Sequence, residues 1–137
     1  VYFLPYLMGE RSPINDTGAR GTLVGMTMDT TRADLTQAVL EGVAFAIRDS
    51  LEVARSLGLE IKRSMLCGGG ARSPLWRRIM AMVCCGEYPS VDAVCSALVR
   101  VSGVVLQEPE LAARYEPRYR AFRQIYPALR AVFPRLG

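Results

Sequence analysis

The strongest constraint on the fold is a long stretch of helical periodicity over residues 33–57. Apolar side chains recur there at three- and four-residue steps, which places one broad apolar stripe along a helix. Thr31 and Asp34 precede the stripe as a variant of the capping box, and Gly58 follows it where a left-handed residue commonly ends a helix. The pattern predicts a long amphipathic helix, and its apolar face requires a packing partner of similar length.

A second unit has the order strand, glycine-rich turn and helix. Residues 62–67 predict a short strand, glycines occupy positions 68–70, and Ser73 and Pro74 are a typical N-cap and first helical residue. Glycines let a ligand approach the backbone, and amides at a helix start favour phosphate. The turn is the best candidate for a ligand site, but it is neither a P-loop nor a GxGxxG motif. A tight turn without a ligand explains the same residues.

The remaining segments predict shorter elements. Residues 1–20 are rich in turn-forming Gly and Pro after an apolar start, and residues 21–28 predict a strand. A short helix is expected over residues 90–101 and a Tyr-rich helix over residues 110–133. The latter contains two prolines that should mark helix starts or kinks, because each removes a backbone donor.

Cysteine and histidine usage excludes several kinds of chemistry. The chain has four cysteines, no CxxC pair and no histidine. A zinc site is therefore not expected, and neither a Ser-His-Asp triad nor a Cys-His dyad can be assembled from this chain. Because no secretory signal or bilayer-spanning apolar run is present, the cysteines predict buried thiols in a reducing cytoplasm.

The net charge of +4 is carried mainly by arginines near the end of the sequence. A basic surface can attract phosphate groups or nucleic acid. A solvated helix face explains the same arginines, and no nucleic-acid-binding motif is present, so neither nucleic acid nor a membrane is an expected partner.

Loop carboxylates are weaker candidates for a site. Glu10 and Arg11 are adjacent in a loop and could contact a ligand, form a hinge ion pair or lie in an ordinary surface turn. Asp16 and Asp29 could reach a metal ion, but lone loop aspartates more often cap turns. No metal-binding residue is predicted.

Residues 21–41 carry two linked groups of constrained positions. The first comprises Gly21, Leu23, Gly25 and Met26, and the second, after a seven-residue spacer, comprises Asp34, Leu35, Ala38, Val39, Leu40 and Glu41. This pattern resembles the C-terminal signature of the FGGY carbohydrate kinases. The segments PYLMGERSP and GGGARSPLW and the closing helix are similar to the same family, most of all to its xylulose kinases.

The resemblance implies an α/β fold of the ribonuclease-H-like class found in actin and hexokinase, with residues 1–137 as a partial C-terminal domain. It implies a cytoplasmic enzyme, often dimeric, that uses ATP and Mg²⁺ to phosphorylate a ketopentose, D-xylulose, to xylulose 5-phosphate. By resemblance, the nucleotide-binding residues are Gly68, Gly69, Gly70, Ala71 and Ser73.

Three departures from the family pattern accompany the resemblance. The family's N-terminal domain, which carries the sugar pocket and the catalytic Asp, has no counterpart here, so no catalytic residue is expected and the isolated chain should be inactive. A strand, a turn and most of a helix are missing between Ala81 and Met82, and Thr17 stands where the family often has Pro. The alternative is a non-catalytic truncated remnant that binds at most a nucleotide or a partner.

Overall fold

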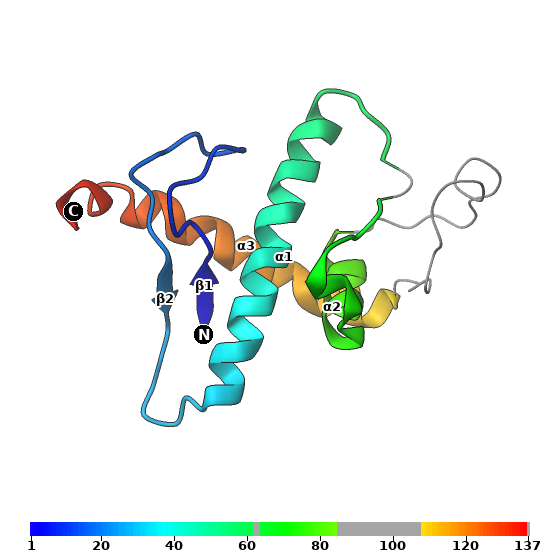
Figure 1. Ribbon diagram of the computed structural model, residues 1–137, viewed down its shortest axis with the longest axis horizontal. Helices are drawn as coiled ribbons and strands as arrows, with labels where there is room; N and C mark the ends of the chain where they lie inside the picture. Colours follow the sequence, from blue (N-terminus) through cyan, green and yellow to red (C-terminus); the bar gives the residue numbers. More distant parts are fainter. Residues whose placement is uncertain (62–63, 85–107, 137) are drawn as a thin grey trace.

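The computed structural model describes residues 1–61, 64–84 and 108–136. This part of the chain contains an antiparallel sheet of two strands, β1 and β2, and three α-helices, α1 to α3 (Figure 1). The elements are β1 (Tyr2–Leu4), β2 (Thr22–Val24), α1 (Arg32–Ser56), α2 (Pro74–Cys84) and α3 (Pro109–Leu129), with 3₁₀ helices at Gly69–Arg72 and Phe133–Arg135.

The predicted long helix is confirmed, because α1 begins and ends within one residue of the expected limits. Both halves of the capping box form: the Asp34 N–H donates to Thr31 Oγ1 at 3.2 Å, and the Thr31 N–H donates to Asp34 Oδ2 at 2.8 Å. Gly58 has a φ of +84°, the left-handed conformation predicted for the end of this helix. Short-range hydrogen bonds thus define both ends of α1.

Strand β1 lies between β2 and α1 (Figure 1). It pairs with β2 so that Tyr2 is opposite Val24 and Leu4 opposite Thr22. On its other side β1 packs directly on α1 at Gly42, where a Cβ atom would lie 2.2 Å from the Phe3 carbonyl oxygen. The absence of a side chain at position 42 is what allows strand and helix to approach so closely.

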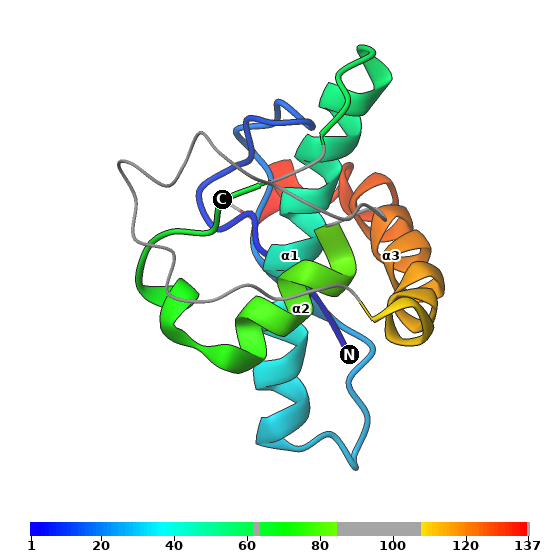
Figure 2. The same cartoon turned by 90° about the vertical axis from the view of Figure 1, so that its right-hand side faces the viewer.

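Helices α2 and α3 lie beside each other and both contact α1 (Figure 2). The core forms where the three helices and β1 meet. Phe45 of α1 is buried against Tyr119 and Phe122 of α3, with ring centroids 5.9 and 5.3 Å away. Each fully buried side chain of this size contributes about 1.5–3 kcal/mol relative to its exposed state.

Several local predictions differ from the structure. The strand expected over residues 21–28 is shortened to β2, and residues 64–67 form no strand in the described part of the chain. Pro117 and Pro127 lie inside α3, so of the two predicted positions, helix starts or kinks, the helix starts are excluded. An extended segment becomes a strand only where another strand can pair with it, and a helix packed along its length can continue through a proline.

The cysteine prediction is partly wrong. Cys84 is buried in the core, as predicted, but Cys67 is exposed. Cys85, Cys95 and the helix predicted over residues 90–101 lie outside the described residues. Among the helices that the structure describes, none has the length and hydrophobicity needed to cross a bilayer.

Candidate functional site

The predicted nucleotide turn is a short 3₁₀ helix that leads directly into α2. Gly68 precedes it with a φ of +91°, and the 3₁₀ helix covers Gly69–Arg72. The Ala71 N–H donates to the Gly68 carbonyl at 3.2 Å, and the Ser73 N–H donates to the Gly70 carbonyl at 2.9 Å. The structure thus places all five predicted residues in one continuous turn, but the strand expected before it is absent from residues 64–67.

Ser73 and Pro74 start α2 as the sequence predicted. Pro74 is the first residue of the helix, and the Trp76 N–H donates to Ser73 Oγ at 3.3 Å. The amides of the first turn of α2 therefore follow immediately after the glycine-rich segment, and the positive end of the helix dipole lies there.

The three glycines of the turn differ in what the surrounding structure requires of them. Gly68 has a positive φ, which disfavours any residue with a Cβ atom. A Cβ atom on Gly70 would lie 1.4 Å from the ring of Trp76, so this glycine is required by packing within the chain. Gly69 has an ordinary φ and open space around it, so nothing in the described residues requires a glycine there.

Trp76 covers the inner side of the turn. Its indole ring packs on Gly70, and its Nε1–H is buried without a hydrogen-bond partner in the described part of the chain. The turn therefore has one face closed by an aromatic ring and an open face at Gly68 and Gly69, both of which are exposed.

The loop carboxylates serve structural roles. Asp16 Oδ1 accepts from the Gly18 N–H at 2.8 Å, and Oδ2 accepts from the Tyr126 hydroxyl at 2.7 Å. The Tyr126 hydrogen bond is the main reason why the pKa of Asp16 is lowered. This confirms the turn-capping interpretation for Asp16. Glu10 accepts from the Ser12 N–H at 3.1 Å and so also stabilises its own turn.

No group of three His, Cys, Asp or Glu side chains within the described residues could hold a metal ion. Asp16 is engaged by its two donors, and Asp29 is exposed in the loop before α1. Within the part of the chain that the structure describes, side chains alone therefore do not form a Mg²⁺ site.

The sequence interpretation missed a polar interface between α1 and α3. Glu41 is buried and accepts hydrogen bonds from Gln37 Nε2 at 2.8 Å and from the guanidinium of Arg118. Asp49 is also buried and accepts from the Tyr119 hydroxyl at 2.6 Å. Burial raises the pKa of Asp49 and outweighs the opposing effect of that hydrogen bond. One signal was available, because Glu41 and Asp49 fall on the apolar stripe of α1 at helical spacing from Phe45.

Comparison with known proteins identifies the family. The C-terminal domain of the FGGY family of carbohydrate kinases matches residues 1–91. The chain belongs to this family. It is 32% identical to the xylulose kinase of Escherichia coli strain K12, over 94% of this chain and 32% of that protein. The chain spans about a third, or less, of the length of the curated relatives that it matches.

Solved structures agree with this assignment. A xyloylose kinase from Brucella ovis has a TM-score of 0.83 and 35% identity, over 96% of this chain and 32% of that one. A gluconate kinase from Lactobacillus acidophilus, at 24% identity and a TM-score of 0.82, shares the fold. The FGGY chain therefore belongs to the ribonuclease-H-like α/β fold class. It corresponds to a C-terminal part of that fold.

The matches also bear on the missing segment. The alignment with the Escherichia coli enzyme extends over 153 residues, whereas the whole chain has 137. That enzyme therefore carries residues between the matched segments that this FGGY chain lacks. The predicted position of the gap, between Ala81 and Met82, lies where α2 is about to end at Cys84.

Proposed function

We propose that this FGGY chain, over residues 1–137, is part of the C-terminal domain of a kinase that transfers the γ-phosphoryl group of ATP to D-xylulose. In this reaction a sugar hydroxyl oxygen attacks the γ-phosphorus, the bond to the β,γ-bridging oxygen breaks, and the hydroxyl proton is transferred to a base. The products are xylulose 5-phosphate and ADP. The proposal is supported by relatives named xylulose kinase and by the solved xyloylose kinase structure.

The proposed contribution of this chain is one wall of the nucleotide site, formed by Gly68, Gly69, Gly70, Ala71 and Ser73. The observation that carries this proposal is the open backbone at Gly69. A positive φ explains the glycine at position 68, and contact with the Trp76 ring explains the glycine at position 70. Neither reason applies to Gly69. A ligand that contacts the backbone would supply the missing reason, and the amides at the start of α2 favour a phosphate-bearing one.

We assign the catalytic residues to a part of the enzyme other than this chain. No residue described here is placed as the base that accepts the hydroxyl proton, and no residue is assigned to Mg²⁺. Phosphoryl transfer depends on positioning and charge stabilisation by several groups acting together. We therefore expect the isolated chain to be inactive, and we assign the sugar pocket and the base to a partner N-terminal kinase domain in the same enzyme.

Nucleotide binding is tested by amide NMR titration of the chain with MgATP. Shifts confined to residues 67–76 support the proposed site. Gly69→Val places two methyl groups on the open face and should abolish those shifts while leaving the spectrum dispersed. Ala33→Val adds similar bulk at an exposed position of α1 and should have no effect on binding. Shifts that persist in Gly69→Val would place the nucleotide elsewhere.

The reaction is tested by adding a matching N-terminal kinase domain in trans. A reassembled pair should show turnover that requires both ATP and D-xylulose, while each part alone shows none. A folded pair that binds MgATP but gives no turnover favours the alternative, a non-catalytic remnant. The specific observation behind that alternative is the set of residues that the Escherichia coli enzyme has and this chain lacks.

We also propose that the enzyme is cytoplasmic and homodimeric, and that neither nucleic acid nor a membrane is a partner. They follow from the family assignment and the absence of a nucleic-acid-binding motif rather than from any contact within the chain. Light scattering of the assembled enzyme tests the dimer, and a monomeric mass would remove this part of the proposal.

A further inference from the structure

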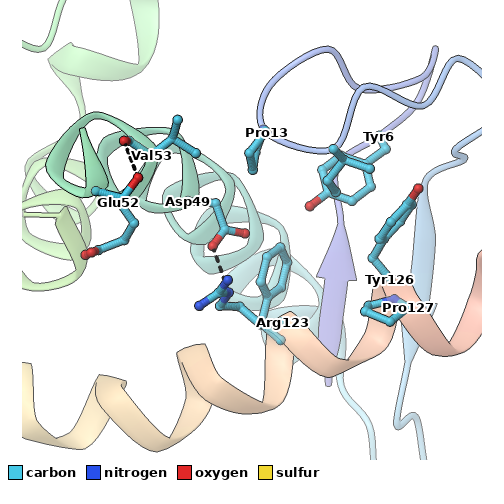
Figure 3. Close-up of a pocket in the computed structure, with 11 residues that line it drawn as sticks. Tyr6, Pro13, Asp49, Glu52, Val53, Arg123, Tyr126 and Pro127 are labelled. Carbon is cyan, nitrogen blue, oxygen red and sulfur yellow. Dashed lines mark hydrogen bonds and ion pairs between the residues drawn. The ribbon is translucent and has the colours of Figure 1, made fainter.

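A pocket of about 420 Å³ opens between α1, α3 and the loop that follows β1. Its volume falls within the range of small-molecule sites. Apolar walls come from Pro13, Val53 and Pro127, and polar side chains enter from α1, from α3 and from the loop (Figure 3). The pocket is separate from the glycine-rich turn, because no residue of that turn lines it.

Asp49 supplies a buried carboxylate to this pocket. The residue is 8% exposed, and its Oδ1 atom accepts from the Tyr119 hydroxyl at 2.6 Å and lies 3.3 Å from Arg123 Nε. Both interactions involve the same oxygen. Within the described residues, Oδ2 accepts no hydrogen bond, and this leaves an acceptor beside the pocket.

Tyr6 supplies a hydroxyl that has no partner within the described residues. Its side chain is 1% exposed, and its ring packs edge-on against Tyr126 with centroids 6.0 Å apart. Figure 3 shows the hydroxyl pointing into the pocket, on the side where Asp49 lies. This hydroxyl is not one of the fully enclosed side-chain atoms that lack a partner in the described residues, so it remains accessible from the pocket. Tyr126 differs, because its hydroxyl donates to Asp16.

The charges around the pocket are already balanced. Arg123 is paired with Asp49, and Glu52 Oε1 is paired with Arg55 at 2.7 Å and Arg48 at 3.5 Å. A charged ligand would have to displace one of these pairs. A neutral ligand would leave them in place, provided that it offers hydrogen-bond donors to Asp49 Oδ2 and a partner to the Tyr6 hydroxyl.

We propose that this pocket binds a small neutral polyol of monosaccharide size through two adjacent hydroxyl groups. One hydroxyl donates to Asp49 Oδ2. Its neighbour exchanges a hydrogen bond with the Tyr6 hydroxyl, and the C–H face of the ligand packs on Phe122 and the apolar wall. Adjacent hydroxyls suit the site because the Tyr6 hydroxyl points toward the side of the pocket where Asp49 lies (Figure 3). This inference does not rest on the proposed kinase activity.

The test is an amide NMR titration of the chain with myo-inositol, which carries adjacent hydroxyls on a six-membered ring. Cyclohexane-1,4-diol has the same ring without adjacent hydroxyls, and 1,4-diaminobutane represents the cationic alternative. Saturable shifts at Tyr6, Asp49 and Arg123 are expected with myo-inositol only. Saturable binding of the diol at equal strength, preference for the diamine, or no saturable binding of myo-inositol would each overturn the proposal.

Two tyrosine variants separate ligand recognition from folding. Tyr6→Phe removes a hydroxyl that makes no hydrogen bond in the structure, so the fold should be retained while affinity for myo-inositol falls about fivefold, as expected for one neutral hydrogen bond. Tyr115→Phe is the matched control outside the pocket and should leave affinity within about twofold, inside the scatter of single-contact effects. Equal affinity of Tyr6→Phe and the wild type would refute the assigned role of Tyr6.

Discussion

The contact between Gly42 and β1 gives the sharpest test of the fold. In Gly42→Ala the new Cβ atom would lie 2.2 Å from the Phe3 carbonyl oxygen and 3.1 Å from its carbonyl carbon. Both are backbone atoms, so the clash cannot be relieved by rotation of a side chain. Either β1 or α1 must move by about 1 Å to restore an ordinary contact distance. Leu4, which is fully buried at the end of β1, would be displaced with the strand.

Two opposing effects set the magnitude of this change. Alanine is favoured over glycine inside a helix by about 1 kcal/mol. Overpacking of a tightly packed contact typically costs about 1–3 kcal/mol, and we expect the upper end here because backbone has to shift. The free energy of unfolding should therefore fall by about 1–2 kcal/mol. For a chain of this size, that corresponds to a decrease in Tm of about 3–8 °C.

Urea unfolding followed by circular dichroism measures this change, with Thr36→Ala as the control. Thr36 is exposed on α1, and alanine there raises helix propensity without a clash, so its stability should be equal to or slightly above that of the wild type. If Gly42→Ala also proved as stable as the wild type or more so, the variant would show the gain in helix propensity without the cost of a clash with β1. Such a result would refute the close contact between β1 and α1 at Gly42.

Three further changes test other parts of the structure. Thr31→Ala removes the acceptor for the Asp34 N–H and should cost about 1 kcal/mol in urea unfolding, whereas loss below about 0.2 kcal/mol would contradict the capping box. Gly70→Ala collides with the Trp76 ring, so it should cost about 1–3 kcal/mol and change the Trp fluorescence, and an unchanged spectrum would place the ring elsewhere. Burial raises the pKa of Asp49, so the folded state binds this proton more tightly than the unfolded state. The contribution of Asp49 to stability should therefore fall as pH rises from the ordinary carboxyl pKa of 3.8 through the raised value, and Asp49→Asn should remove this fall in urea titrations across that range.

The elements that the sequence predicted well are those whose limits depend on nearby residues. The ends of α1 follow from the capping box at Thr31 and the left-handed Gly58, and the start of α2 follows from Ser73. The hydrogen bonds involved span three or four residues, so a local pattern contains them. The segment 64–67 has apolar residues suited to a strand, but a strand also requires a pairing partner, which a local pattern cannot reveal.

The same distinction applies to the candidate site. The glycine-rich turn and the start of α2 were recognisable from residue types. The packing of Trp76 on Gly70 was not, because the turn and the ring meet only after α2 forms. A glycine-rich motif therefore combines residues required by the fold with residues available to a ligand. In this turn, Gly69 is the position that packing and backbone conformation leave unexplained.

Helix α3 belongs to the same packing unit as the family signature, although the match to the family domain ends at residue 91. Glu41, the last position of the signature, is buried on α1, and Arg118 of α3 is the cation paired with it. An ionised carboxylate buried without a cation is strongly unfavourable. Asp49, two turns further along α1, is likewise paired with a cation of α3, Arg123, and accepts from the Tyr119 hydroxyl. The two buried acidic positions of α1 therefore depend on contacts from α3, which places α3 in the same packing unit as α1.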